Sequence, residues 1–203
     1  METDIRIRMA RWEDAPALLD IFTPYVLQTA VAFNYEPPTL EEFRATMEDR
    51  LRRYPYLVAQ RGGELIGYAY ASPHRTRAGY QWSCETSIYT KKGFHRMGIA
   101  SALYGALDEL LNYQGYYSIY VGITCPNERS MSFNKSMGFE YMGVYRNSMF
   151  KFGEWRDVIW MGKSLRQHQG VPRPIIPYPQ IPDPAFCQGV LEFYASRIHG
   201  AKA

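Results

Sequence analysis

The chain has 203 residues, of which 46% are apolar and 21% are charged, and its net charge is +3. This composition indicates a soluble globular protein with enough apolar material for a core, and the small net charge argues against nucleic acid as a partner. No apolar run approaches the roughly 20 residues that a membrane span needs, so we expect no membrane partner.

The N-terminus is charged from the start, which is not typical of a signal peptide. The three cysteines, Cys84, Cys125 and Cys187, are odd in number and far apart. Their spacing indicates neither a metal site nor a disulfide framework. We therefore expect a cytoplasmic protein that binds no metal.

In chain order, strand and helix signals alternate. Alternating polarity and runs of β-branched and aromatic residues predict strands at residues 5–11, 56–60, 65–71, 83–89, 118–124, 139–145 and 156–162. Helical spacing predicts helices at residues 14–25, 39–51, 99–111 and 126–137. We expect Asp14 to cap the first helix, and Thr39 with Glu42 has the capping-box pattern of the second. The order βααβββαβαββ predicts an α/β fold with a mixed sheet.

The composition changes after Leu165. Six prolines fall between residues 172 and 184, which predicts an extended Pro-rich segment rather than a second domain. Residues 185–199 predict a short helix with Phe186, Val190 and Phe193 as its anchors. The expected organisation is one domain over residues 1–165 and a C-terminal extension over residues 166–203.

Residues 83–111 carry the clearest functional signal. A strand with one carboxylate, Glu85, leads through a basic loop with two glycines into an amphipathic helix. Such a loop presents free N–H groups and the positive end of the helix dipole, which suit a pyrophosphate. The alternative is a tight turn with a solvated basic loop. The patterns of a P-loop and of a dinucleotide-binding fingerprint are both absent.

The loop His95–Ala100, HRMGIA, resembles the acetyl-CoA loop of the GNAT superfamily of N-acetyltransferases, Q/R-x-x-G-x-G/A. Residues 75–85, RTRAGYQWSCE, and 153–158, GEWRDV, resemble the phosphinothricin and methionine sulfoximine/sulfone acetyltransferases of that superfamily. The resemblance implies a GNAT fold, with a mostly antiparallel central sheet flanked by helices. It also implies acetyl-CoA as co-substrate, a small amino-acid-like acceptor and a homodimer.

Acetyl transfer to an ammonium ion needs a base, and Glu85 is the candidate, directly or through a water. Its alternative role is to pair with Arg75 or Arg77 and close the site. These two arginines present forks suited to carboxylate or phosphinate oxygens, unless they are simply solvated. Tyr80 and Trp82 are expected to wall the acceptor pocket.

The remaining roles follow from the resemblance. Backbone N–H groups of the strand at residues 86–89 are expected to hold the acetyl oxygen, the loop the pyrophosphate, and Asn127 the pantetheine arm. The expected cofactor-binding residues are Ser87, Ile88, Tyr89, His95, Arg96, Met97, Gly98, Ile99, Ala100 and Asn127.

The position that protonates the CoA thiolate departs from the family. Relatives place a tyrosine or histidine seven residues after the asparagine, whereas this chain has Asn134, which cannot act as a general acid at neutral pH. Either a tyrosine such as Tyr141 or Tyr145 protonates the thiolate, or the thiolate leaves unaided.

Two other functions stay open. The chain fits an enzyme that acetylates another amine, such as a polyamine, an aminoglycoside or a protein N-terminus, although the cationic region 75–96 argues against polycations. It also fits an acyl-CoA-binding protein without activity. His74 is expected in solvent or at the pocket rim, and Cys84 in the core on the sheet face opposite Glu85.

Overall fold

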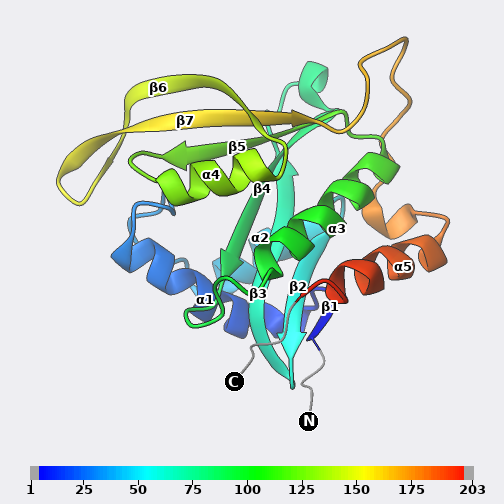
Figure 1. Ribbon diagram of the computed structural model, residues 1–203, viewed down its shortest axis with the longest axis horizontal. Coiled ribbons are helices and arrows are strands. Elements are labelled where there is room, and N and C mark those ends of the chain that lie inside the picture. Colours follow the sequence, from blue (N-terminus) through cyan, green and yellow to red (C-terminus); the bar gives the residue numbers. More distant parts are fainter. Residues whose placement is uncertain (1–4, 199–203) are drawn as a thin grey trace.

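The computed structural model describes residues 5–198 and contains a seven-stranded sheet with helices on both faces (Figure 1). The strands are β1 (Ile5–Met9), β2 (Tyr56–Arg61), β3 (Glu64–Pro73), β4 (Ser83–Thr90), β5 (Ser118–Thr124), β6 (Glu140–Lys151) and β7 (Glu154–Ser164). The helices are α1 (Ala15–Gln28), α2 (Leu40–Leu51), α3 (Ile99–Gln114), α4 (Glu128–Ser136) and α5 (Pro184–Ala195). The predicted order βααβββαβαββ is confirmed, with α5 following it.

The sheet is mostly antiparallel, as expected. Its strand order is β1-β2-β3-β4-β5-β7-β6, and β4 with β5 forms the parallel pair. Because side chains alternate along a strand, the middle strands feed two cores. Val58 and Tyr68 pack with α1 and α2 on one face, whereas Leu57 and Ala69 pack with α3 and α5 on the other. Cys84 is fully buried in the second core, where the sequence places it.

The two helix-start predictions have different outcomes. At α2, Thr39 Oγ1 accepts from the Glu42 N–H at 3.2 Å, and Glu42 Oε2 accepts from the Thr39 N–H at 2.8 Å, so the capping box is confirmed. At α1, the Asp14 side chain makes no cap hydrogen bond to the helix. Its carboxylate instead accepts two bonds from the Arg8 guanidinium, at 2.7 and 2.8 Å, and one from the Arg11 N–H at 2.7 Å. The prediction for Asp14 is wrong because a charge-assisted fork outcompetes the helix N–H groups.

The C-terminal extension packs against the rest of the chain. Gln114 Nε2 donates to the carbonyl oxygens of Ile176 and Arg53 at 2.7 and 2.8 Å. The bond to Ile176 attaches the Pro-rich segment to the end of α3. Helix α5 lies on α3 so closely that a Cβ at Gly105 would be 2.1 Å from the ring of Tyr194. The extension therefore forms part of the core on this face (Figure 1).

The anchors of α5 differ in part from those expected. Val190 is buried, as predicted, together with Cys187 and Leu191, whereas Phe193 is 48% exposed. The last residue of the expected helix, His199, lies outside the described residues. Within residues 5–198, no helix is both long and apolar enough to cross a membrane.

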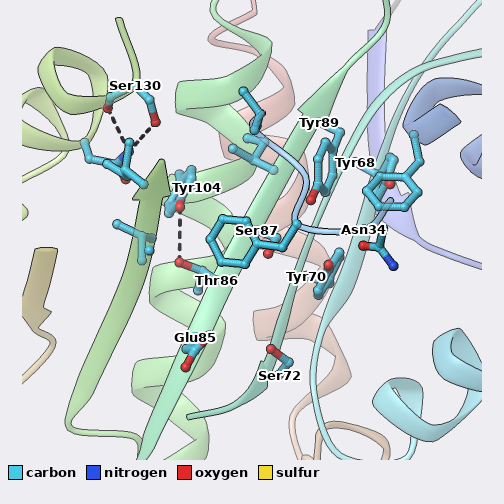
Figure 2. A pocket seen from close by; sticks show the side chains of 18 of the residues that line it. Asn34, Tyr68, Tyr70, Ser72, Glu85, Thr86, Ser87, Tyr89, Tyr104 and Ser130 are labelled. Atoms are coloured by element: carbon cyan, nitrogen blue, oxygen red, sulfur yellow. Dashed lines mark hydrogen bonds between the residues drawn. The ribbon is translucent and has the colours of Figure 1, made fainter. Parts of the chain in front are cut away.

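The feature that positions the site is the separation of β4 from β5. The parallel pairing covers only Ser83–Glu85 with Ser118–Tyr120, after which the strands diverge. Strand β4 continues along β3, with Gly67 opposite Thr90. The residues of β4 beyond Glu85 therefore have a strand on one side and a gap on the other (Figure 2).

Candidate active site

A cavity of ≈ 400 Å³ occupies the region where β4 and β5 separate (Figure 2). This volume lies in the range of small-molecule sites. Its lining includes these residues of β3 and β4: Tyr68, Tyr70, Ser72, Glu85, Ser87 and Tyr89. They share one sheet face, because Ser72, Tyr70 and Tyr68 are opposite Glu85, Ser87 and Tyr89 in register. The segment between α1 and α2 contributes Asn34 from across the cavity.

Glu85 is the carboxylate of this cavity, and two cationic or ionisable side chains hold it. His74 Nδ1 lies 2.9 Å from Glu85 Oε1, and Arg75 donates to the same oxygen at 3.4 Å. The Glu85 side chain is 29% exposed, so it is both anchored and accessible. The sequence predicted Arg75 beside Glu85. It placed His74 in solvent or at the rim, whereas His74 is only 13% exposed and is a direct partner of Glu85.

Aromatic rings fix the position of His74. Its ring lies 4.5 Å from that of Tyr120, 5.7 Å from Tyr80 and 5.8 Å from Trp160, measured between centroids. The guanidinium of Arg75 lies 5.6 Å from the Trp160 ring. Tyr80 therefore packs on His74 and does not line the cavity, whereas Trp160 does line it.

Arg77 and Trp82 lie away from this cavity. Arg77 is exposed at the start of a short 3₁₀ turn, where its carbonyl oxygen accepts from the Tyr80 N–H at 2.9 Å. Trp82 Nε1 donates to the carbonyl oxygen of Arg173 at 2.9 Å. Because the extension satisfies this indole, Trp82 anchors the Pro-rich segment, and neither residue lines the cavity beside Glu85.

The separated part of β4 supplies backbone donors. The Lys91 N–H bonds to the Ile66 carbonyl oxygen in β3, whereas the Thr90 N–H points the other way, to the Tyr25 hydroxyl at 3.3 Å. Because donors alternate along a strand, the Ile88 N–H points to the same side as that of Thr90, into the gap. This group is positioned to donate to an oxygen bound between β4 and β5.

A second cavity, of ≈ 590 Å³, continues from the gap toward the start of α3. It brings together four of the expected cofactor residues, Ile88, His95, Ala100 and Asn127, with Lys91 and Lys92 beside them. The loop reaches this geometry through left-handed backbone at Gly93, Arg96 and Gly98, with φ of 94°, 66° and 81°. Met97 and Ile99 bury their side chains, so they can contribute only backbone N–H groups.

Two polar side chains of this groove are held in place. His95 Nδ1 lies 3.0 Å from Thr90 Oγ1, and partial burial, with a contribution from Arg129, lowers the pKa of His95. Asn127 Oδ1 accepts from the Ser130 N–H at 3.1 Å and so caps α4. The cap leaves the Nδ2 amino group of Asn127 as the end that can face a ligand.

The residues expected to handle the thiolate are distributed differently from the prediction. Tyr141 and Tyr145 are 61% and 52% exposed, and neither lines the cavity. Asn134 does line it, and its buried Oδ1 has no hydrogen-bond partner within the part of the chain that the structure describes. Tyr104 of α3 does line the cavity, and its hydroxyl accepts from Thr86 Oγ1 at 3.1 Å (Figure 2). Burial raises the pKa of Tyr104 well above its ordinary value.

Sequence reasoning missed His74 and Tyr104 as site residues. Tyr104 falls within a helix whose apolar spacing explains its presence, and His74 stands alone in a polar loop, so neither belongs to a local motif. Among residues 5–198, no group of three or more His, Cys, Asp or Glu side chains is arranged to hold a metal ion.

Comparison with known proteins agrees with this geometry. A sequence model of the acetyltransferase (GNAT) domain matches residues 7–160. Phosphinothricin N-acetyltransferase of Streptomyces viridochromogenes is 33% identical over 177 residues, covering 87% of this chain and 96% of the relative. The L-methionine sulfoximine/L-methionine sulfone acetyltransferase of Pseudomonas aeruginosa is 31% identical over 168 residues, covering 82% of this chain and 98% of the relative.

Comparison with solved structures also finds acetyltransferases of the GNAT superfamily. The crystal structure of a GNAT-superfamily phosphinothricin acetyltransferase from Sinorhizobium meliloti, in complex with acetyl-CoA, superposes with a TM-score of 0.79 at 27% identity. The match covers 86% of this chain and 98% of that one. The similarity therefore extends over nearly the whole length of these proteins.

Proposed function

The chain belongs to the GNAT family of acetyltransferases, and we propose that it transfers the acetyl group of acetyl-CoA to the amino group of a small amino acid of the phosphinothricin, methionine sulfoximine or methionine sulfone type. Acetyl-CoA is a substrate of this reaction, and the acceptor amine attacks it directly in a ternary complex. The observation that carries the proposal is the position of Glu85, an accessible carboxylate at the point where β4 and β5 separate.

Glu85 is the proposed base. It accepts a proton from the acceptor ammonium, directly or through a water, so that the neutral amine can attack the thioester. His74 and Arg75 both contact Oε1, which leaves Oε2 as the oxygen that can take the proton. The β4 N–H groups in the gap, with Ile88 foremost, are proposed to stabilise the oxyanion of the tetrahedral intermediate.

Tyr104 is the proposed partner of the departing thiolate, in place of Tyr141 and Tyr145. Thr86 Oγ1 donates to its hydroxyl oxygen, so the phenolic proton is available for a bond into the cavity. An ordinary thiol has a pKa of about 8.5, below that of a buried phenol, so full proton transfer from Tyr104 would be unfavourable. Tyr104 therefore acts as a hydrogen-bond donor, and the thiolate takes its proton from solvent after release.

The remaining ligand assignments rest on the groove. We propose that the loop His95–Ala100 binds the pyrophosphate through backbone N–H groups, with Lys91 and Lys92 adding charge. Asn127 is proposed to contact the pantetheine arm, and Ser87 and Tyr89 to line the acetyl end. Arg75 stays a candidate for the acceptor carboxylate, at the edge of the cavity.

A cytoplasmic homodimer is the proposed state of the protein. All three cysteines are free thiols, which fits a reducing compartment. Strands β6 and β7 expose a series of large apolar side chains, Tyr141, Met142, Tyr145, Phe150 and Trp155, which is typical of an interface. Sedimentation equilibrium of the purified protein gives the mass that decides between monomer and dimer.

The substitution Glu85→Gln tests the reaction. We expect it to lower kcat by about 10²- to 10⁴-fold, the usual contribution of a general base, because the amide cannot accept the proton. The assay is release of free CoA thiol with phosphinothricin, methionine sulfoximine and methionine sulfone. Calorimetric titration with acetyl-CoA is the control, and its affinity should be unchanged.

Each other outcome has a defined meaning. Unchanged turnover in Glu85→Gln removes Glu85 from the role of base. Turnover by the wild type only with other amines, in a broader panel, keeps the reaction and replaces the acceptor. Binding of acetyl-CoA without thiol release from any amine favours an acyl-CoA-binding protein.

A further inference from the structure

Arg50, a cationic side chain that lines the cavity beside Glu85, has no acidic partner among the described residues. The lining of this cavity includes two charged side chains, Glu85 and Arg50. Glu85 has His74 and Arg75 as partners, whereas no carboxylate among residues 5–198 lies within ion-pairing distance of Arg50. A half-buried guanidinium without an acidic partner carries a desolvation cost that an anionic ligand would offset.

Arg50 is held in an orientation that suits an anion. It lies in the last turn of α2, and its guanidinium carbon is 4.0 Å from the centroid of the Tyr70 ring. A guanidinium stacked on an aromatic face keeps its N–H groups in the plane, free to form a fork with two oxygens. The stacking holds Arg50 with its guanidinium beside the Tyr56 hydroxyl, and no carboxylate among residues 5–198 occupies the donors that recognise a carboxylate or phosphinate.

Further hydroxyl donors surround Arg50. Tyr56, fully buried, stacks on Tyr70 with centroids 5.0 Å apart; its hydroxyl lies beside the Arg50 guanidinium, although Tyr56 itself does not line the cavity. Tyr68 and Tyr89 belong to the same cluster, 5.2 Å apart (Figure 2). Burial raises the pKa of Tyr56, Tyr68 and Tyr89 well above the usual value, so these phenols stay protonated and can donate.

The spacing between Arg50 and Glu85 fits a small amino acid. Tyr70 and Ser72 are two residues apart on β3, about 7 Å along the strand, and face the same side. Ser72 is opposite Glu85 in register, while Tyr70 carries Arg50. An acceptor whose amine lies at Glu85 can therefore present an acidic group to Arg50.

We infer that Arg50, with the tyrosine hydroxyls around it, binds an oxyanion of the acceptor and so selects amines that carry an anionic group. The inference rests on the proposed function and adds to it the residue that recognises the acceptor. Arg75 is less suited to this role, because it is bonded to Glu85 and its side chain is 43% exposed. The oxyanion is either the α-carboxylate or an acid on the side chain, and both have the same chemistry.

The test compares Arg50→Met with acceptors that keep or lack each anion. Methionine sulfone and its α-amide differ only in the carboxylate, and phosphinothricin adds a side-chain phosphinate. Initial rates of CoA release give kcat/KM for each pair of enzyme and acceptor. Arg52→Met is the matched control, since Arg52 is two residues away on the surface, with its side chain 74% exposed.

We expect Arg50→Met to lower kcat/KM by about 10- to 100-fold for the acceptor whose anion it binds, mainly through KM, with the KM of acetyl-CoA unchanged. If the α-carboxylate is the ligand, methionine sulfone loses this factor and its amide does not. If the side-chain acid is the ligand, phosphinothricin loses it and methionine sulfone does not. Arg50→Lys, which keeps the charge without the fork, should fall between Arg50→Met and the wild type.

Equal losses with all three acceptors would mean that Arg50 only supports the tyrosine cluster, and would overturn the inference. The inference is also overturned if neither Arg50→Met nor Arg50→Lys changes kcat/KM for any acceptor. If Arg50→Met does not fold, the Arg50→Lys comparison decides alone, by the same acid-to-amide ratio. A wild type inactive with every acceptor would refute the proposed function and, with it, this inference.

Discussion

The contact between His74 and Glu85 leads to a prediction that separates hydrogen bonding from packing. His74→Phe removes the 2.9 Å bond to Glu85 Oε1 but keeps a ring against Tyr120 and Trp160. His74→Asn does the reverse, because its amide N–H can replace Nδ1–H while the ring contacts are lost. The two variants therefore affect different interactions of the same residue.

The expected magnitude follows from the exposure of the pair. A hydrogen bond to a charged group contributes about 1.5–3 kcal/mol, and solvent reaches the Glu85 side chain, which is 29% exposed. Arg75 still contacts the same oxygen, so part of the orientation survives. A net loss of about 1–2 kcal/mol lowers kcat by roughly 5- to 30-fold in His74→Phe.

The assay is steady-state kinetics of CoA release, with kcat and both KM values, and the melting temperature as a check of folding. We expect His74→Phe to lower kcat with the KM of acetyl-CoA unchanged, and His74→Asn to restore most of the loss. Equal kcat in His74→Asn and His74→Phe would refute the argument, because the ring contacts rather than the hydrogen bond would then matter. Wild-type kcat in His74→Phe would show that Glu85 needs no support from His74.

Two further predictions concern Tyr104 and Asp108, two buried polar side chains of α3. Tyr104→Phe should lower kcat about tenfold, because the departing thiolate loses one charge-assisted hydrogen bond. Thr86→Val leaves the phenol in place and should have a smaller effect. Unchanged kcat in Tyr104→Phe would exclude Tyr104 as the partner of the thiolate. Burial raises the pKa of Asp108 to about 6, although Lys163 Nζ donates to it at 2.6 Å. Because the folded pKa exceeds the unfolded one, ionisation of Asp108 lowers the free energy of unfolding as pH rises from about 4 to about 6, by up to ~3 kcal/mol. In urea titrations across this range, the free energy of unfolding of Asp108→Asn minus that of the wild type should rise with pH, and a constant difference would contradict the assignment.

The sequence predicted the order of strands and helices because each element depends mainly on near neighbours. The capping box at Thr39 is an example, since its two partners are three residues apart. Asp14 shows the limit of such reasoning, because its partner Arg8 comes from the preceding strand. A local motif identifies a side chain that can cap a helix, but not a competitor that the fold brings to it.

The candidate site likewise contains residues that the sequence predicted and residues that it placed wrongly. The carboxylate at Glu85 and the glycine-bearing loop before α3 follow from the sequence, because a strand, a turn and a helix in succession define their surroundings. Trp82 and Arg77 were expected beside the acceptor from their place in the same polar stretch. The position of Trp82 depends on the C-terminal extension, which is distant in the sequence, whereas Arg77 starts a 3₁₀ turn within the stretch that its polar pattern did not reveal.

What the sequence by itself determined is the family, the element order and the position of Glu85, the candidate base, along the chain. Only the tertiary structure decided which side chains contact Glu85 and line its cavity. His74 reaches Glu85 across the β3–β4 pairing, Tyr104 comes from α3, and Arg50 comes from α2. These contacts depend on how the helices pack on the two sheet faces and on where β5 leaves β4. Such packing is set by the summed burial of many residues, and no single stretch of the chain encodes it.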